Sequence, residues 1–354
     1  MKHTILFTGG GTLGPVTPLL AVAKEWQERE PDVQVEWIGT PTGPERDIVE
    51  RYGYIFHSLK SPKLSRHKWW TWPIIVPALT VSCLQARKLL KTIRPDIVFS
   101  AGGFTSIPVV WMAKLMSIPS WIHQLDVTPG LANRLMAPFA SRISVTWEQT
   151  AQFFGIEKTL VVGGMMRTEI VRGDRERFLR EYKFDSSKKL VLILGGGTGA
   201  EAINNALQVI VEELVRNVNI FHVTGPGKML QEEQYVIPGY VVTEFIDAEI
   251  KDAFAAADVV VSRAGMGTIL ELIGLQKPAV LIPIPASHQV ENARMADEIG
   301  FAHVIYNLTP QVLQQEIHRL VMNGDLRKVM QTNARKSLPM HAEKGIVNKA
   351  MELV

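Results

Sequence analysis

The 354-residue sequence contains one cysteine, Cys83, so it cannot form an internal disulfide bond. It also lacks a long apolar run, because its most hydrophobic stretch, 69–84, contains two prolines and is shorter than the ~20 residues that a membrane-spanning helix needs. The apolar run at the N-terminus soon reaches glycines, which predicts a buried strand and not a signal peptide. We therefore expect no transmembrane helix, and the scarcity of cysteine is consistent with a reducing compartment.

The chain lacks a strong charge of either sign, since its formal net charge is +3. A charge this small gives no support for a nucleic-acid partner, although it permits a local basic patch. Two phosphate-handling signatures are also missing. There is no Asp-x-Asp sequence to hold a metal on a diphosphate, and no glycine turn ends in the Gly-Lys-Ser/Thr of a P-loop. We therefore expect neither a metal nor a cofactor.

Short apolar runs alternate with helical patterns along the chain, which predicts parallel sheets covered by helices on both faces. Two such series, each opening on a strand and a glycine-rich turn, predict an α/β fold with two tandem Rossmann-like domains facing across a cleft. The predicted strands are 4–8, 33–38, 97–100, 120–123 and 143–146 in the first half, and 190–194, 220–224, 240–242, 259–262, 279–282 and 303–306 in the second.

The charged stretch 167–189 is expected to separate the two halves. We place an N-terminal domain at 1–162 and a C-terminal domain at 163–340. A last helix is expected at 341–354, and one possible arrangement is that it packs back onto the first domain.

Four glycine-rich turns follow predicted strands, two in each half, at 8–15, 102–106, 195–200 and 263–268. Glycine lets the backbone approach a phosphate closely, and the next helix presents unpaired N–H groups and the positive end of its dipole. One such turn is weak support for a ligand, since any strand–helix junction can use glycine for a tight turn alone. Four turns in two domains favour a phosphate-bearing ligand whose charge is met by backbone amides and helix ends.

An NAD-dependent enzyme is the natural competitor among Rossmann-like proteins. It would need an acidic residue at the end of the second strand to hold the ribose. Here the strand ends in Ile38-Gly39-Thr40, and Glu36 lies inside it. The sequence therefore disfavours NAD.

With these turns, the chain resembles the MurG family over nearly its whole length. Members have the two-Rossmann fold called GT-B. They transfer N-acetylglucosamine from UDP-GlcNAc to the lipid-linked muramyl-pentapeptide (lipid I), which gives lipid II in peptidoglycan synthesis. In the first half, Gly9–Ala23, Gly102–Pro108 and His123–Asn133 resemble family segments on the acceptor side. In the second half, Gly163–Arg167, Gly195–Asn204 and, most specifically, Ser262–Asn292 resemble the donor-site motifs.

The resemblance implies roles for individual residues. Glu271 would hold the ribose hydroxyls, because a carboxylate can accept two hydrogen bonds from a diol. Ile246 would lie at the uracil, and Gln289, with His288, at the hydroxyls of the sugar. The full implied donor set is Arg167, Gly196, Gly197, Thr198, Ile246, Gly265, Glu271, His288 and Gln289. The implied acceptor-diphosphate set is Gly10, Gly11, Thr12, Gly14, Gly102, Gly103 and Ser106, with His123 and Asn133 also on the acceptor side.

The chain departs from the family pattern at three places. Pro15 stands where the first family loop has histidine, Asp126 stands where the family's His-Glu-Gln-Asn segment ends in asparagine, and Gly164-Met165-Met166 replaces Asn-Pro-Val. An inverting displacement needs a general base for the acceptor hydroxyl. We hypothesise that Asp126 is that base. The alternative is that Asp126 caps the turn that follows it, and His123 has the simpler interpretation of a satisfied histidine at a strand end.

A basic and aromatic stretch runs from Lys60 to Val76, and three of the chain's eight tryptophans fall within four positions of it. Basic residues beside an aromatic–aliphatic run suit an anionic membrane surface. The alternative is a core-facing helix start that follows a solvated basic loop. We expect membrane contact at the cytoplasmic face of the cell membrane, as a peripheral protein, through Lys68, Trp69, Trp70 and Trp72.

Other functions remain compatible with the pattern. A GT-B transferase with another lipid-linked or glycan acceptor, a UDP-GlcNAc 2-epimerase and a catalytically inactive UDP-sugar-binding homologue share the expected fold. The last is prompted by Pro15.

Overall fold

The structure is a computed structural model that describes residues 2–11, 14–62, 72–195, 200–228 and 237–354. It divides into two compact units, Met1–Met165 with Pro339–Val354, and Met166–Leu338. The chain thus changes unit after Met165, slightly beyond the predicted boundary at 162/163. The charged stretch 167–189, expected to separate the halves, lies within the second unit, where it contributes helix α7 (Arg175–Glu181).

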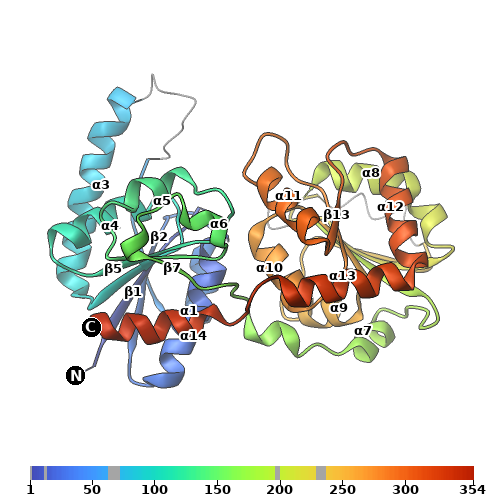
Figure 1. The fold of residues 1–354 in the computed structure, drawn as a ribbon, viewed down its shortest axis with the longest axis horizontal. Coiled ribbons are helices and arrows are strands. Elements are labelled where there is room, and N and C mark those ends of the chain that lie inside the picture. Colours follow the sequence, from blue (N-terminus) through green and yellow to red (C-terminus); the bar gives the residue numbers. More distant parts are fainter. Residues whose placement is uncertain (1, 12–13, 63–71, 196–199, 229–236) are drawn as a thin grey trace. The chain divides into compact units, whose positions relative to one another are not determined.

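The first unit contains a seven-stranded sheet in the order β3-β2-β1-β4-β5-β6-β7, in which every neighbouring pair is parallel. Helices follow most of its strands in the sequence (Figure 1). The strands are β1 (Thr4–Thr8), β2 (Gln34–Gly39), β3 (Ile55–Ser58), β4 (Ile97–Ser100), β5 (Ser120–Gln124), β6 (Arg142–Val145) and β7 (Thr159–Val161). The α-helices before the crossing to the second unit are α1 (Val16–Arg29), α2 (Glu45–Arg51), α3 (Trp72–Ile93), α4 (Ser106–Leu115), α5 (Leu131–Met136) and α6 (Glu148–Ala151).

The last helix, α14 (Ala342–Ala350), packs beside α1 in the first unit (Figure 1). Its buried residues Ile346 and Val347 belong to the same apolar cluster as Leu19 and Trp26 of α1. The returning chain is fixed at its entry as well, because Gly164 N donates to Pro339 O at 2.9 Å. Residues 339–354 therefore complete the core of the first unit.

The second unit contains a six-stranded parallel sheet in the order β10-β9-β8-β11-β12-β13. The strands are β8 (Lys189–Leu194), β9 (Val218–Val223), β10 (Tyr240–Thr243), β11 (Val259–Ser262), β12 (Ala279–Leu281) and β13 (Ala302–Val304). Besides α7, its α-helices are α8 (Glu201–Leu214), α9 (Ile250–Ala256), α10 (Met266–Gly274), α11 (Gln289–Ile299), α12 (Pro310–Met322) and α13 (Gly324–Ser337).

The strand order reverses at one point in each sheet, between β1 and β4 in the first and between β8 and β11 in the second. In open parallel sheets, ligands bind outside the carboxyl ends of the strands at such a switch point. The four glycine-rich turns follow β1, β4, β8 and β11. Each unit therefore carries its two turns where this fold binds ligands.

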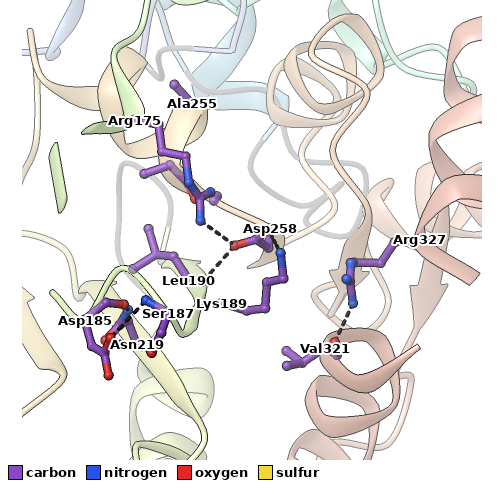
Figure 2. Close-up of polar contacts among 12 residues, drawn as sticks. Arg175, Asp185, Ser187, Lys189, Leu190, Asn219, Ala255, Asp258, Val321 and Arg327 are labelled. Carbon is purple, nitrogen blue, oxygen red and sulfur yellow. Dashed lines mark hydrogen bonds and ion pairs between the residues drawn. The ribbon is translucent and has the colours of Figure 1, made fainter. Parts of the chain in front are cut away.

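At the opposite end of the second sheet, Asp258 joins β8 to β11 (Figure 2). Its carboxylate accepts hydrogen bonds from Leu190 N at 3.0 Å and Arg175 Nη2 at 3.2 Å, and from Lys189 Nζ at 3.1 Å. Burial by itself would raise the pKa of Asp258, but the Leu190 amide and the two cations outweigh it and lower the pKa. The charged form of Asp258 therefore stabilises the sheet.

We expect Asp258→Asn to lower the free energy of unfolding at pH 7 by about 1–2 kcal/mol. This is the energy of hydrogen bonds to a charged group, reduced because the partner side chains of Asp258 are partly exposed to solvent. Because the folded pKa lies below the unfolded value, this stabilisation is fully present above about pH 4 and is lost as the pH falls through the folded pKa. Urea unfolding at pH 7 and pH 3 measures it, with exposed Asp297→Asn as control. An equal loss at both pH values would contradict this account.

Candidate active site

The two glycine turns of the first unit pack backbone against backbone. Gly103 has φ +94°, and a Cβ there would lie 3.0 Å from Gly10 O and 3.1 Å from Gly10 N. Gly11 has φ +86°, and a Cβ there would lie 2.8 Å from the Phe104 ring. Any other residue type at these two positions would be strained and crowded. The turns after β1 and β4 therefore form one composite surface at the switch point.

Polar atoms without partners gather at this edge of the sheet. Among the residues that the structure describes, Thr8 Oγ1, Thr105 Oγ1 and Asn133 Oδ1 are buried without a hydrogen-bond partner. Asn133 Oδ1 lies 3.4 Å from the position that a Cβ on Gly102 would take. Buried polar atoms in proteins are nearly always hydrogen-bonded, so a polar group from outside the chain suits this edge.

Several other predicted acceptor-side residues shape the loops around this surface. Ser106 Oγ donates to Gly102 O at 2.9 Å, which ties the start of α4 to the second turn. Asn133 Nδ2 donates to His123 O at 3.1 Å and to Gln124 Oε1 at 2.6 Å. Gly14 lies in the turn just before α1, whereas Thr12 lies outside the described residues.

His123 lies on β5, and its buried side chain contacts the neighbouring strand β6 and the residue that follows it. Its Nδ1 lies 2.9 Å from Ser144 Oγ and its Nε2 lies 3.3 Å from Thr146 Oγ1. Burial lowers the pKa of His123 to about 3, so the ring is neutral at physiological pH. These contacts fit the interpretation of a satisfied histidine at a strand end, and a contact of His123 with the acceptor stays a prediction.

Asp126 lies half-buried in the loop that follows β5. Strand β5 pairs with β4, and the second glycine turn follows β4. Two side chains fix this loop: Gln124 Nε2 donates to Asp126 O at 2.8 Å, and Thr150 Oγ1 donates to Val127 O at 2.8 Å. The fold thus brings Asp126 to the carboxyl edge of the sheet. Its role as a base stays a prediction.

In the second unit, two residues predicted for the donor meet each other. Arg167 Nε donates to Glu271 Oε1 at 2.8 Å, although 104 positions separate them in the sequence. Glu271 lies on α10 and is 8% exposed. Burial raises its pKa, and Arg167 opposes that rise without cancelling it. The pair therefore places a carboxylate and a guanidinium beside the fourth glycine turn.

The fourth glycine turn is held by two side chains from other elements. Arg263 Nη1 donates to Ile282 O at 3.2 Å, and Asn292 Nδ2 donates to Ala264 O at 3.3 Å. Gly265 then begins α10 as its N-cap, and nothing lies within 4 Å of the position that a Cβ would take there. The first turn of α10 thus presents its N–H groups at a fixed and open place, which suits an anion.

Three of the predicted donor residues, Gly196, Gly197 and Thr198, lie outside the described residues. Elsewhere in the second unit, a buried network for which the sequence gives no signal joins α8 to β9 and β10. His222 Nε2 lies 3.0 Å from Asn204 Oδ1, His222 Nδ1 lies 2.9 Å from the Tyr240 hydroxyl, and Asn204 Nδ2 donates to Thr224 O at 3.2 Å. Burial lowers the pKa of His222 to about 4, so its ring is neutral and supports the start of α8.

The remaining predicted donor residues lie at the start of α11 and on the loop after β10 in the second unit. Gln289 opens α11, and its Oε1 accepts from Ile284 N at 3.2 Å. His288 precedes it as the exposed N-cap. Ile246 is half-buried in the loop after β10. Their contacts with a nucleotide or sugar stay predictions.

The predicted membrane residues Lys68, Trp69 and Trp70 lie outside the described residues, and Trp72 opens α3. Within the described ranges, no helix is long and apolar enough to cross a membrane. In the same part of the chain, no three His, Cys, Asp or Glu side chains are grouped as metal ligands would be.

Comparisons with known proteins agree with this arrangement. The model of the glycosyltransferase family 28 N-terminal domain matches residues 5–145, and that of the family 28 C-terminal domain matches residues 190–345. A relative from Geobacillus kaustophilus (strain HTA426) is 35% identical over 362 residues, and the alignment covers 100% of this chain and 100% of that relative. That relative is named a UDP-N-acetylglucosamine–N-acetylmuramyl-(pentapeptide) pyrophosphoryl-undecaprenol N-acetylglucosamine transferase.

Among solved structures, MurG of Acinetobacter baumannii is 26% identical and has a TM-score of 0.75, with 99% of this chain and 100% of that chain covered. An assigned UDP-N-acetylglucosamine 2-epimerase from Listeria monocytogenes has a TM-score of 0.65 at 12% identity, covering 99% of this chain and 95% of that chain. That second likeness concerns the fold alone. The predicted GT-B fold is confirmed, and both halves of the chain match family models. The chain belongs to glycosyltransferase family 28.

Proposed function

We propose that the chain transfers N-acetylglucosamine from UDP-GlcNAc to the lipid-linked muramyl-pentapeptide and thereby makes lipid II for peptidoglycan. The observation that carries this proposal is the Arg167–Glu271 pair beside the amino end of α10. A buried carboxylate suits a ribose diol, and the helix end suits a diphosphate. The full-length relatives named for this reaction support the same donor and acceptor.

In the proposed reaction, an acceptor hydroxyl attacks the anomeric carbon of the sugar and UDP leaves. Backbone amides and the α10 dipole stabilise the charge that develops on UDP. The composite glycine surface of the first unit receives the diphosphate of the acceptor. We propose that these groups suffice without a metal.

Incubation with labelled UDP-GlcNAc and lipid I, followed by product analysis, tests this function. We expect labelled lipid II, formed equally well with excess EDTA. UDP binding without a labelled lipid product would instead indicate an inactive homologue. Formation of an epimerised sugar nucleotide without acceptor would indicate a 2-epimerase. Loss of the product in EDTA alone would contradict only the metal-free mechanism.

We also propose that the first unit binds the cytoplasmic face of the cell membrane through α3 and the segment before it. Helix α3 exposes apolar side chains at Val76, Val81 and Leu84, which are 58%, 54% and 62% exposed. Exposed Arg87 and Lys88 follow on the same helix. An apolar face with basic residues nearby suits an anionic lipid surface.

Replacing Trp69, Trp70 and Trp72 with Ala should weaken sedimentation with anionic liposomes at least about tenfold, because the proposed contact would lose apolar side chains that bind the lipid. Replacing the exposed Val76, Val81 and Leu84 with Ser should weaken it to a similar extent. Val209→Ser changes an equally exposed apolar residue of the second unit, 68% exposed, and serves as the control. Sedimentation of both triple variants at the original level would count against membrane contact here.

A further inference from the structure

Glu45 is a fully buried acidic residue for which the proposed reaction has no use. It opens α2 and is 0% exposed. A buried carboxylate is costly unless hydrogen bonds satisfy it. Glu45 Oε1 accepts from Thr40 N at 2.7 Å and from the Thr40 hydroxyl, and Glu45 Oε2 accepts from Gly11 N at 3.2 Å. The carboxylate therefore joins the loop after β2 to the first glycine turn.

The loops leave room for this carboxylate and for nothing larger. A Cβ on Gly10 would collide with Glu45 Oε1, and a Cβ on Gly43 would collide with Glu45 Oε2. Gly10 in turn touches Gly103 of the second glycine turn. Glu45 thus contacts the first glycine turn directly, and the first turn contacts the second. A change in the position of the Glu45 carboxylate would therefore shift both turns.

The hydrogen bond to Gly11 also changes the expected use of that residue. Its N–H was predicted for the acceptor diphosphate, but it donates to Glu45. An amide already bound to a carboxylate is not available to a phosphate in this conformation. In this conformation Gly11 therefore serves the shape of the turn, and its contact with the acceptor diphosphate stays a prediction.

We propose that Glu45 is a positioning residue for the acceptor site, whose carboxylate fixes the two glycine turns before the acceptor diphosphate binds. This inference rests on the proposed function of that surface. Preorganised groups bind more tightly because no ordering cost remains at the moment of binding. A carboxylate suits the task better than an amide, since it only accepts hydrogen bonds and its neighbours here all donate.

The test compares Glu45→Gln with the wild-type protein. Glutamine has the same shape, but its NH2 group would oppose either the Gly11 or the Thr40 amide. We expect the Kd and KM for lipid I to rise about tenfold, from the loss of one charge-assisted hydrogen bond. The affinity for UDP, whose predicted residues lie in the second unit, should stay within about twofold, the scatter expected when nothing else changes.

Two further variants keep the test decisive. Thr40→Val removes one hydroxyl donor and should raise the Kd for lipid I about threefold, as expected for a weaker neutral hydrogen bond. Glu50→Gln, at an exposed residue of the same helix, should change neither Kd. If Glu45→Gln lowers UDP affinity together with thermal stability, the residue is merely structural, and the proposal is overturned.

The outcomes separate this inference from the proposed function. Unchanged lipid I affinity in Glu45→Gln would overturn the positioning role even if transfer is normal. If wild-type protein binds lipid I but transfers no sugar, the proposed function fails, and the binding comparison still decides the role of Glu45. A wild-type protein that does not bind lipid I overturns both.

Discussion

Replacing Glu271 with glutamine is expected to weaken UDP binding by about 30- to 100-fold, because two hydrogen bonds from the ribose diol would lose their charged acceptor. Arg167, which donates to the same carboxylate at 2.8 Å, would lose its ion pair as well. Titration calorimetry with UDP measures the effect. Exposed Glu298→Gln on α11 is the matched control and should bind as the wild type does.

The pH dependence of binding provides a second readout for Glu271. Burial raises the pKa of this carboxyl, with Arg167 opposing the rise. Its charged form is lost as the pH falls through that raised pKa, so wild-type affinity should decline at a higher pH than an ordinary glutamate would give. The glutamine variant should lack this decline. A folded Glu271→Gln protein with wild-type UDP affinity would remove Glu271 from the ribose site.

Asp126→Asn should reduce kcat by at least about 100-fold if Asp126 takes the proton from the acceptor hydroxyl. In that step a bond forms between the acceptor oxygen and the anomeric carbon, the bond from that carbon to UDP breaks, and UDP leaves with the electron pair. Asparagine keeps the size of the side chain but cannot accept the proton. Steady-state kinetics with saturating lipid I and UDP-GlcNAc measure the change.

The competing interpretation of Asp126 is a cap for the turn that follows it. That role predicts little change in kcat and at most a small fall in melting temperature, because asparagine also suits such turns. Exposed Asp32→Asn in the same unit is the control for a lost surface charge. An unaltered kcat would exclude Asp126 as the base and leave the search to other groups near the composite surface.

Sequence periodicity predicts the central strands well because burial on both faces gives them uninterrupted apolar runs. The predicted strands 4–8, 97–100 and 259–262 agree with β1, β4 and β11. The edge strands β3 and β7 are absent from the prediction. Each is short and partly exposed, so neither shows a continuous apolar run. Pairing with a neighbour, not composition, makes them strands.

The site is only partly readable from the sequence. Glycine turns and the stretch around Glu271 give a local signal, because their residues are close along the chain. Glu45 gives none, because the partner that explains it, Gly11, is 34 positions away. His222 is similar, since it lies inside an apolar strand and meets Asn204 and Tyr240 only after β8, β9 and β10 assemble. Long-range partners of this kind are created by the fold.

The docking of α14 on α1 has a consequence for how the protein is made. Ile346 and Val347, which lie in the core of the first unit, are translated only after the whole second unit. While the ribosome is still producing residues 166–338, the apolar surface of α1 that α14 covers has no native partner. The unit that begins first is therefore completed last, and the nascent chain carries an open hydrophobic face throughout most of its synthesis.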